Sequence, residues 1–155
     1  MDLGISGKNA LVCGASRGLG KACALALARE GVNIVSRSVK IPQVELGLSN
    51  GARSGLVGFA AGLARQTVAR NVTINNLLPG IFDSDAQYRH IRGMLTGTNK
   101  TFEEAYRERA DASPARRYGD PAEFGAYCAF LCSSQSGYIT GQSLLIDGGS
   151  YPGTF

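Results

Sequence analysis

The feature that most constrains this chain is a glycine-rich run, GASRGLG, at positions 14–20. It directly follows a short apolar stretch at residues 8–13. It opens residues 19–30, where alanine and leucine form a compact apolar face at helical spacing before a glycine ends the pattern. The order predicts a strand, a tight turn and a helix.

Each glycine of this run has its own role in such a turn. Gly14 permits the tight turn, Gly18 lets the backbone approach a pyrophosphate, and Gly20 lets the helix lie close to the sheet. The free N–H groups and the dipole at the start of the helix favour a phosphate charge. The run therefore favours a dinucleotide site over its alternative, a simple turn between a strand and a helix.

The remainder of the chain alternates strands with helices. Strands are predicted at residues 32–35, 72–78 and 142–146, and helices at 49–70, around 102–112 and at 121–132. Asp120 stands as the N-cap of the last helix, with proline next and Glu123 at the third position. The alternation predicts a single α/β domain over residues 1–155. Its fold is a Rossmann-like doubly wound parallel sheet of about four strands with helices on both faces.

Composition excludes several other classes of protein. The net charge is +4, but the basic residues are scattered and no run exceeds the pair Arg116 and Arg117, so we expect no nucleic-acid partner. No apolar run reaches membrane-spanning length and no signal peptide opens the chain. We therefore expect a cytoplasmic protein in a reducing compartment.

The four cysteines form no CxxC motif. Cys128 and Cys132 are four residues apart and share a predicted helix face, which is the spacing of a metal half-site. Two small, buried apolar residues have the same spacing, and we favour this second interpretation. We expect no metal site.

Four motifs resemble those of the short-chain dehydrogenases/reductases. Residues 14–20 have that family's GxxxGxG spacing, and residues 71–80 resemble its sixth strand and Pro-Gly turn. Residues 117–123 resemble its RxGxPxE segment, and residues 139–149 its closing TGQ…DGG strand. The motifs occur in the family's order over nearly the whole chain. The residues of these motifs are similar to those of the 3-oxoacyl-(acyl-carrier-protein) reductase branch.

The resemblance implies a nicotinamide dinucleotide that passes a hydride to or from a carbonyl or secondary-alcohol substrate. The cofactor-binding residues it implies are Gly14, Ser16, Arg17, Gly18, Leu19, Gly20, Pro79, Gly80, Ile81 and Ser84. NADP is favoured, with NAD as the alternative, because Arg17 stands where NADP-preferring members place a basic residue near the 2′-phosphate. In addition, no acidic residue lies between Glu30 and Glu45, where an NAD-type acid is expected. The segment from 81 to 113, including Tyr88 and Ile91, corresponds to the family's substrate pocket or to packing.

The catalytic positions depart from the family's Ser, Tyr and Lys. Ser36 has the spacing of the family's serine, whereas Ser49 replaces the tyrosine and Arg53 replaces the lysine. A serine hydroxyl is too weak an acid to stand in for a phenol without a strong activator. The alternatives to an enzyme are a non-catalytic dinucleotide-binding or assembly protein and an inactive fragment of a longer chain.

The middle of the family's domain is absent, because its second to fourth strands have no counterpart. Residues 31–36 read as a splice, which marks an internal deletion or an unrecorded gap. Strand 4 of such a sheet lies next to strand 1, so without it either residues 32–35 pair with strand 1 directly or residues are missing from the sequence. The spacing to Ser36 favours residues 32–35 as the family's fifth strand. The alternative is that residues 32–35 are the family's second strand, in which case Arg37 would reach a 2′-phosphate.

The predicted helix at 49–70 contains four glycines. Each glycine costs a helix about 1 kcal/mol relative to alanine. That cost favours close packing against another helix, and the resemblance implies that the other helix belongs to a second subunit. We therefore expect a homodimer or homotetramer through this helix.

Overall fold

The computed structural model describes residues 2–37 and 46–153, with the side chains of residues 37, 46–50 and 52 outside the description. The elements run β1 (Asn9–Cys13), α1 (Gly18–Arg29), β2 (Asn33–Arg37), α2 (Leu46–Thr67), β3 (Asn76–Pro79), α3 (Asp85–Met94), α4 (Phe102–Asp111), α5 (Pro121–Leu131) and β4 (Ser143–Ile146). Short 3-10 turns at Val68–Arg70 and Ser134–Ser136 follow α2 and α5. The predicted alternation of strands and helices is confirmed.

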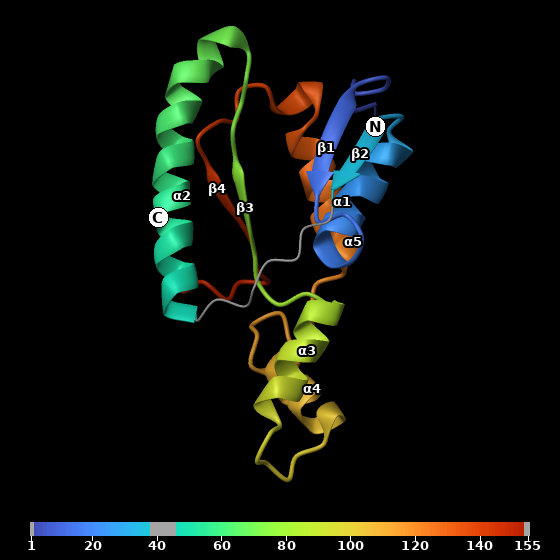
Figure 1. Ribbon diagram of the computed structural model, residues 1–155, viewed down its shortest axis with the longest axis vertical. Coiled ribbons are helices and arrows are strands. Elements are labelled where there is room, and N and C mark those ends of the chain that lie inside the picture. The colour runs from blue at the N-terminus through green and yellow to red at the C-terminus, as the bar shows by residue number, and fades with distance from the viewer. Residues whose placement is uncertain (1, 38–45, 154–155) are drawn as a thin grey trace.

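The strands of the described residues form two separate parallel pairs. β1 pairs with β2, with Leu11 opposite Val35, and β3 pairs with β4, with Leu77 opposite Leu144. Figure 1 shows the two pairs side by side, with α2 next to β3 and β4. A cavity of about 1010 Å³ lies between them, lined by Ala10 of β1 and Leu77 of β3 among others. It occupies the place beside strand 1 where a complete doubly wound sheet has its fourth strand.

The first strand pair is covered on one face. Its inward residues pack on α1 and α5 in a core that consists of Ile5, Ala10, Val12, Leu27, Val32, Ile34 and Ala129 with their neighbours. On the other face Leu11 is 67% exposed and Val35 is 62% exposed. A doubly wound sheet has helices on both faces, so this pair retains only half of its cover among the described residues.

Helix α5 joins the two strand pairs. It crosses α1 so closely that a Cβ on Gly125 would lie 2.5 Å from the Ala22 carbonyl oxygen. Beside the crossing, the ring of Phe124 meets that of Phe82 edge-on, with centroids 5.5 Å apart. The cluster around them draws on both pairs and both helices, and contains Val12, Leu19, Cys23, Leu77, Phe82, Phe124, Cys128 and Ile146. This cluster is the apolar contact that holds the two halves together.

The predicted start of α5 is confirmed. The Asp120 side chain accepts a hydrogen bond from the Ala122 N–H at 2.8 Å, and Glu123 accepts one from the Asp120 N–H at 2.8 Å. The Arg117 guanidinium forms two further bonds to Glu123, and these contacts lower the pKa of that carboxyl to about 2. Reciprocal capping of this kind fixes the first turn of a helix.

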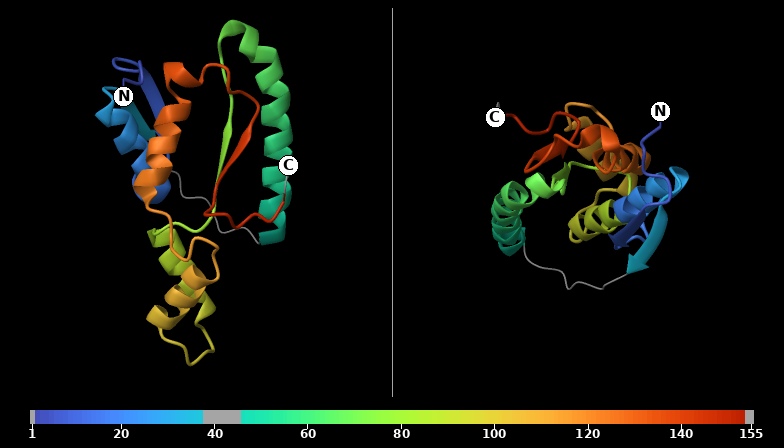
Figure 2. Two further views of the ribbon diagram at one scale, coloured as in Figure 1. Left: turned by 180° about the vertical axis from the view of Figure 1, so that it is seen from behind. Right: turned by 90° about the horizontal axis from the view of Figure 1, so that it is seen from above.

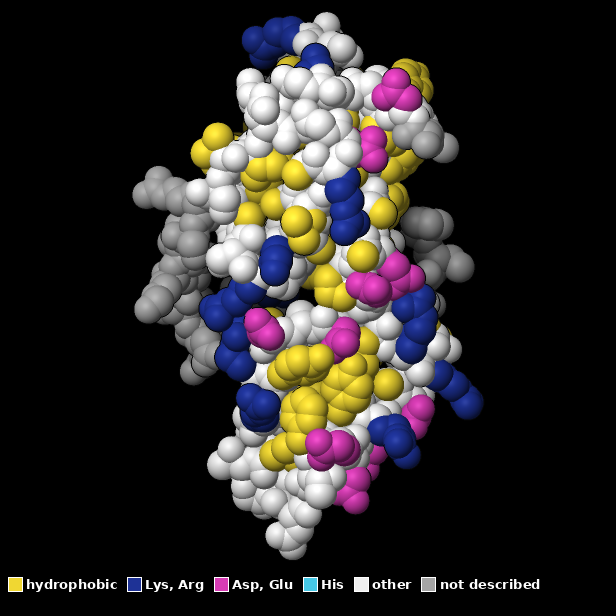
Figure 3. Space-filling model, turned by 90° about the vertical axis from the view of Figure 1, so that its right-hand side faces the viewer, with side chains coloured by type: hydrophobic (Ala, Val, Ile, Leu, Met, Phe, Trp, Pro, Cys, Tyr) yellow, Lys and Arg dark blue, Asp and Glu magenta, His cyan; other side chains and the backbone are white. Residues whose placement is uncertain are grey.

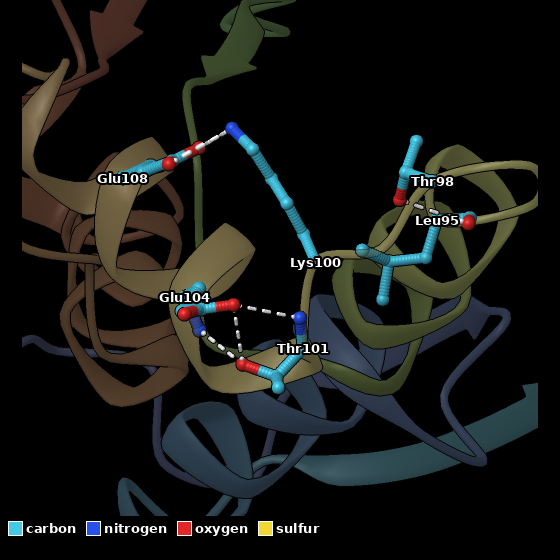
Figure 4. Close-up of polar contacts among 6 residues, drawn as sticks. All are labelled: Leu95, Thr98, Lys100, Thr101, Glu104 and Glu108. Atoms are coloured by element: carbon cyan, nitrogen blue, oxygen red, sulfur yellow. Dashed lines mark hydrogen bonds and ion pairs between the residues drawn. The ribbon is translucent and has the colours of Figure 1, made fainter.

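Helices α3 and α4 form a lobe beyond the strand ends (Figure 1). At the start of α4, Thr101 and Glu104 form a second capping box, with Lys100 paired to Glu108 one turn further on (Figure 4). Hydrophobic side chains gather on one face of this lobe between charged ones (Figure 3). The sequence placed only the second of the two helices clearly.

Two predicted elements differ in extent. Helix α2 starts at Leu46 rather than at residue 49. Strand β3 starts at Asn76 rather than at residue 72, because side chains rather than a ladder hold the residues before it. The Ile74 N–H donates to the Thr140 hydroxyl, and the Asn75 amide donates to the Ile139 carbonyl.

The glycines of α2 have no close neighbour in this chain. A Cβ built at any of them would meet nothing within 4 Å, which holds for Gly51, Gly55, Gly58 and Gly62. Leu56 is 60% exposed and Phe59 is 66% exposed on the same helix. The predicted close approach is therefore not made within the described chain, and a partner subunit stays a prediction.

We predict that Gly125→Ala lowers the free energy of unfolding by about 1–3 kcal/mol, because the new methyl group forces α5 away from α1. Gly93→Ala is the matched control, since Gly93 lies in α3 with nothing within 4 Å of its Cβ position. The free energy of unfolding of that variant should rise by up to about 1 kcal/mol, because alanine is a better helix former than glycine. Urea unfolding followed by circular dichroism measures both, and equal stability of the two variants would contradict the packing described.

Candidate functional site

The glycine-rich turn after β1 has the backbone that the sequence predicted. Gly14 has a φ of +73° and Gly18 a φ of +57°, a left-handed region that favours glycine. A Cβ on Gly20 would lie 2.5 Å from the Gly14 carbonyl oxygen, so the first turn of α1 rests on the loop itself. Open space surrounds Gly14, with nothing within 4 Å of its Cβ position. The turn thus presents bare backbone.

The start of α1 differs from the starts of α3, α4 and α5. Those three helices are capped by the side chains of Ser84, Thr101 and Asp120. In α1 the N-cap is Arg17, whose side chain makes no capping bond, and the first turn holds no acidic residue. Its amides are left for an external acceptor, which matches the requirement of a phosphate group.

The predicted residues between Arg17 and the helix lie around this opening. Ser16 and Arg17 are exposed, and Leu19 is half-buried against the cluster that holds the two strand pairs. Within the part of the chain that the structure describes, no carboxylate pairs with Arg17. Its guanidinium is therefore available to an anionic ligand.

The second predicted cofactor segment follows β3. The Gly80 N–H donates to the Ile146 carbonyl at 3.0 Å, and a Cβ on Gly80 would lie 2.6 Å from the Asp147 Cα. The chain then passes Ile81, and the Asp83 N–H donates to the Gly119 carbonyl at 2.9 Å. These bonds fix the segment against the end of β4 and the start of α5.

The two segments meet at Gly18 and Ser84. A Cβ on Gly18 would lie 3.9 Å from the Ser84 Cβ. A hollow of about 310 Å³ lies between the starts of α1 and α3, lined also by Lys21 and Asp85. The structure therefore brings together the glycine turn and the end of the Pro-Gly segment, which are more than sixty residues apart in sequence. Their role toward a cofactor stays a prediction.

The predicted catalytic residues lie on separate elements. Ser36 is exposed on β2, opposite Val12 of β1. Ser49, whose side chain is outside the description, and the exposed Arg53 belong to α2. β2 and α2 lie on opposite sides of the molecule in both Figure 1 and Figure 2. The structure does not bring these three residues into one site.

β2 pairs directly with β1, which is one of the two alternatives that the sequence left open. In the doubly wound order, strand 1 has strand 2 on one side and strand 4 on the other. β2 lies on the side of β1 away from β3 and β4 (Figures 1 and 2). Its place in the sheet is thus that of the second strand, whereas the spacing to Ser36 favoured the fifth. Arg37, the residue of that alternative, has its side chain outside the described part.

Sequence reasoning missed a polar cluster at the base of the α3–α4 lobe. The Tyr88 and Tyr106 hydroxyls both donate to the Asp83 carboxylate, and the ring of Tyr106 stacks on that of Tyr118 at 4.2 Å. A hollow of about 500 Å³ borders Asp83, Tyr106 and Tyr118. No spacing signal in the sequence links these three residues, because they lie too far apart along the chain.

Of the expected pocket-shaping residues, Ile91 is fully buried and is a packing residue.

These tyrosines are hydrogen-bond donors rather than acid–base groups. Burial and the bond to Asp83 raise the pKa of Tyr106 to about 12, and the bond to Asp83 also raises the pKa of Tyr88. A general acid works best with a pKa near the working pH. The raised pKa values therefore disfavour either phenol as the acid that the sequence predicts to be lost at Ser49.

In the described helices no segment is long and apolar enough to cross a bilayer.

Comparison with known proteins places the chain in a family. The profile described as enoyl-(acyl carrier protein) reductase matches residues 37–151. The 3-oxoacyl-[acyl-carrier-protein] reductase of Vibrio cholerae is 35% identical over 101 residues, which are 64% of this chain and 36% of that protein. An NADPH-dependent reductase of Bacillus subtilis is 29% identical over 119 residues, 77% of this chain and 46% of that protein. The chain thus spans less than half the length of either relative.

A solved structure shares the fold of this chain. L-sorbose reductase from Gluconobacter frateurii, solved in complex with NADPH and L-sorbose, superposes with a TM-score of 0.85 at 17% identity, covering 99% of this chain and 100% of that one. The likeness confirms the Rossmann-like α/β class, and the sequence matches confirm the resemblance to 3-oxoacyl-(acyl-carrier-protein) reductases. This chain belongs to the short-chain dehydrogenase/reductase family and carries an incomplete version of its domain.

Proposed function

We propose that the chain binds NADP(H) at the glycine-rich turn and derives from a cytoplasmic reductase that acts on a small carbonyl or secondary-alcohol substrate. The observation that carries the proposal is the start of α1. It alone among α1, α3, α4 and α5 lacks a side-chain cap, and it faces the Ser84 segment across a hollow. NADPH-dependent relatives and an NADPH-bound neighbour of the same fold support the choice of cofactor.

The residues of the chain divide the work of binding. The amides of Gly18, Leu19 and Gly20 would hold the pyrophosphate, and Arg17 would pair with the 2′-phosphate through its planar guanidinium. Pro79, Gly80 and Ile81 would line the nicotinamide side. The bound dinucleotide would supply a hydride to a carbonyl carbon. A proton for the carbonyl oxygen must come from the protein or from water.

A second candidate function is dinucleotide binding without catalysis. It is favoured by Ser49, which stands in the place of the acid, and by the separation of β2 from α2. In that case Ser36 and Arg53 are surface residues. The inferred break near residues 31–36 makes the chain either a shortened family member or a piece of a longer enzyme.

We predict that Gly18→Val abolishes NADPH binding, because a branched side chain closes the space that the pyrophosphate needs and strains a left-handed residue. Isothermal titration with NADPH measures the loss. Gly97→Val is the matched control, since Gly97 has a φ of +82° and nothing within 4 Å of its Cβ position. Gly97 lies between α3 and α4, away from the glycine-rich turn. Both variants carry a similar strain of about 1–2 kcal/mol. Unchanged NADPH affinity in folded Gly18→Val would refute the site.

We predict that the 155-residue chain binds NADPH but reduces ketones poorly or not at all. General acid–base catalysis is worth about 10²–10⁴-fold, and a misplacement of about 1 Å costs roughly another 10²-fold. The double variant Ser49→Tyr, Arg53→Lys should rescue little, because the strand bearing Ser36 lies away from α2. NADPH oxidation with a panel of ketones, on protein of confirmed intact mass, is the measurement. Robust reduction by the unmodified chain would show that the acid has been misassigned.

We also propose that α2 mediates self-association, because its glycines and the exposed Leu56 and Phe59 have no cover in the described chain. Light scattering should give a mass that is a multiple of 16.3 kDa. Phe59→Glu should shift it to the single-chain mass. Tyr138→Glu, at a fully exposed residue outside α2, should leave it unchanged. A single-chain mass for the unmodified protein at high concentration argues against the interface.

A further inference from the structure

Three of the four cysteines gather where α5 crosses α1. Cys23 is buried on α1, Cys128 is half-buried on α5, and Cys132 lies one turn further along α5 and is exposed. Cys23 and Cys128 belong to one packed cluster, in contact with Phe82 and Phe124. The prediction that Cys128 and Cys132 are both buried is wrong for Cys132, because α5 ends there and leaves its side chain at the surface. The fourth cysteine, Cys13, is exposed at the end of β1.

The helix crossing brings the backbones of α5 and α1 together beside Cys23. A Cβ on Gly125 would lie 2.5 Å from the Ala22 carbonyl and 3.3 Å from the Cys23 backbone nitrogen. Cys128 stands one turn after Gly125, on the same side of α5. Disulfides between helices require backbones that approach this closely, with Cα atoms about 4.4–6.8 Å apart.

Two of the three gathered thiols border the cavity between the two strand pairs. Cys128 and Cys132 line that cavity of about 1010 Å³, beside Phe124 and Leu131. A small neutral oxidant such as hydrogen peroxide can enter a space of this size. Cys23 does not line the cavity, but it belongs to the apolar cluster on which Cys128 packs.

We infer that Cys23 and Cys128 form a peroxide-sensitive thiol pair that closes to an intrachain disulfide and ties α1 to α5. The Cys128 sulfur, which borders the cavity, attacks one oxygen of hydrogen peroxide, the O–O bond breaks, and a sulfenic acid and water result. The Cys23 sulfur then attacks the sulfenic sulfur, the S–O bond breaks, and a second water leaves. In total two thiols lose two electrons and two protons, and one hydrogen peroxide is reduced to two waters.

The protonation of the pair fits this order of events. Hydrogen bonding from the Cys128 thiol lowers the pKa of Cys23 against the opposing effect of burial. Hydrogen bonding with Cys132 lowers the pKa of Cys128, but the contact with Cys23 and burial raise it to about 11 overall. The thiolate is the nucleophile in such reactions, so the lowered pKa of Cys23 favours its attack on the sulfenic sulfur of Cys128.

The test oxidises the full chain with one equivalent of hydrogen peroxide, then counts the free thiols in denaturant and maps the linked peptides by mass spectrometry. Thiols should fall from four to two per chain. Trypsin should yield residues 22–29 linked to residues 118–155, because no Lys or Arg lies after residue 117. Chymotrypsin cleaves after Phe130 and so separates Cys128 from Cys132.

Matched variants identify the pair. Cys132→Ser and Cys13→Ser should each retain the link and fall from three thiols to one, whereas Cys128→Ser should keep all three. Three other outcomes overturn the inference. They are four free thiols after oxidation, a link lost in Cys132→Ser but kept in Cys128→Ser, and a link only between chains. Reduction with dithiothreitol should restore four thiols, and failure to do so would mean irreversible oxidation instead.

Discussion

Where α5 crosses α1, the residue at the point of contact is a glycine, and its lack of a side chain lets the two backbones touch. Gly125 rests on the Ala22 carbonyl, and Phe124 beside it meets Phe82 from the segment after β3. In a complete doubly wound sheet a central strand joins the two halves by hydrogen bonds. Here the helix contact joins them instead, because the two strand pairs share no hydrogen-bonded neighbour among the described residues. It also sets the distance between the glycine turn, which begins α1, and Ser84, which begins α3.

The arrangement explains how a chain with an open middle can keep the two proposed cofactor-binding segments in place. Both segments depend on helix packing and on short backbone bonds, such as that from Gly80 to Ile146, rather than on the missing strands. The predicted catalytic positions are different. They lie on β2 and α2, the two elements whose relative placement in a complete domain depends on the centre of the sheet. We therefore expect that cofactor binding and catalysis are separable in this chain, because the proposed binding segments and the predicted catalytic positions depend on different parts of the fold.

Local signals predicted much of this from the sequence. The turn at residues 14–20 and the capping box of Asp120 and Glu123 are encoded within a few residues, and the structure has both. The extent of β3 was wrong because the Thr140 side chain, far along the chain, bonds to Ile74. The same limit hid the Asp83 cluster and the contact of Cys23 with Cys128, since only the packing of separate elements brings those groups together. The absence of a fourth strand pointed to direct pairing of β2 with β1 as one alternative. It did not indicate on which side of β1 the strand β2 would lie.

We propose that one dinucleotide bridges the uncapped start of α1 and the segment that ends at Ser84. The most direct measurement is a titration of the ¹⁵N-labelled chain with NADPH, followed residue by residue in amide NMR spectra. The account predicts concerted shifts for Gly18, Leu19 and Gly20 together with Ile81 and Ser84, and none at the capped start of α4. Shifts confined to one of the two segments, or centred on the start of α4, would contradict it.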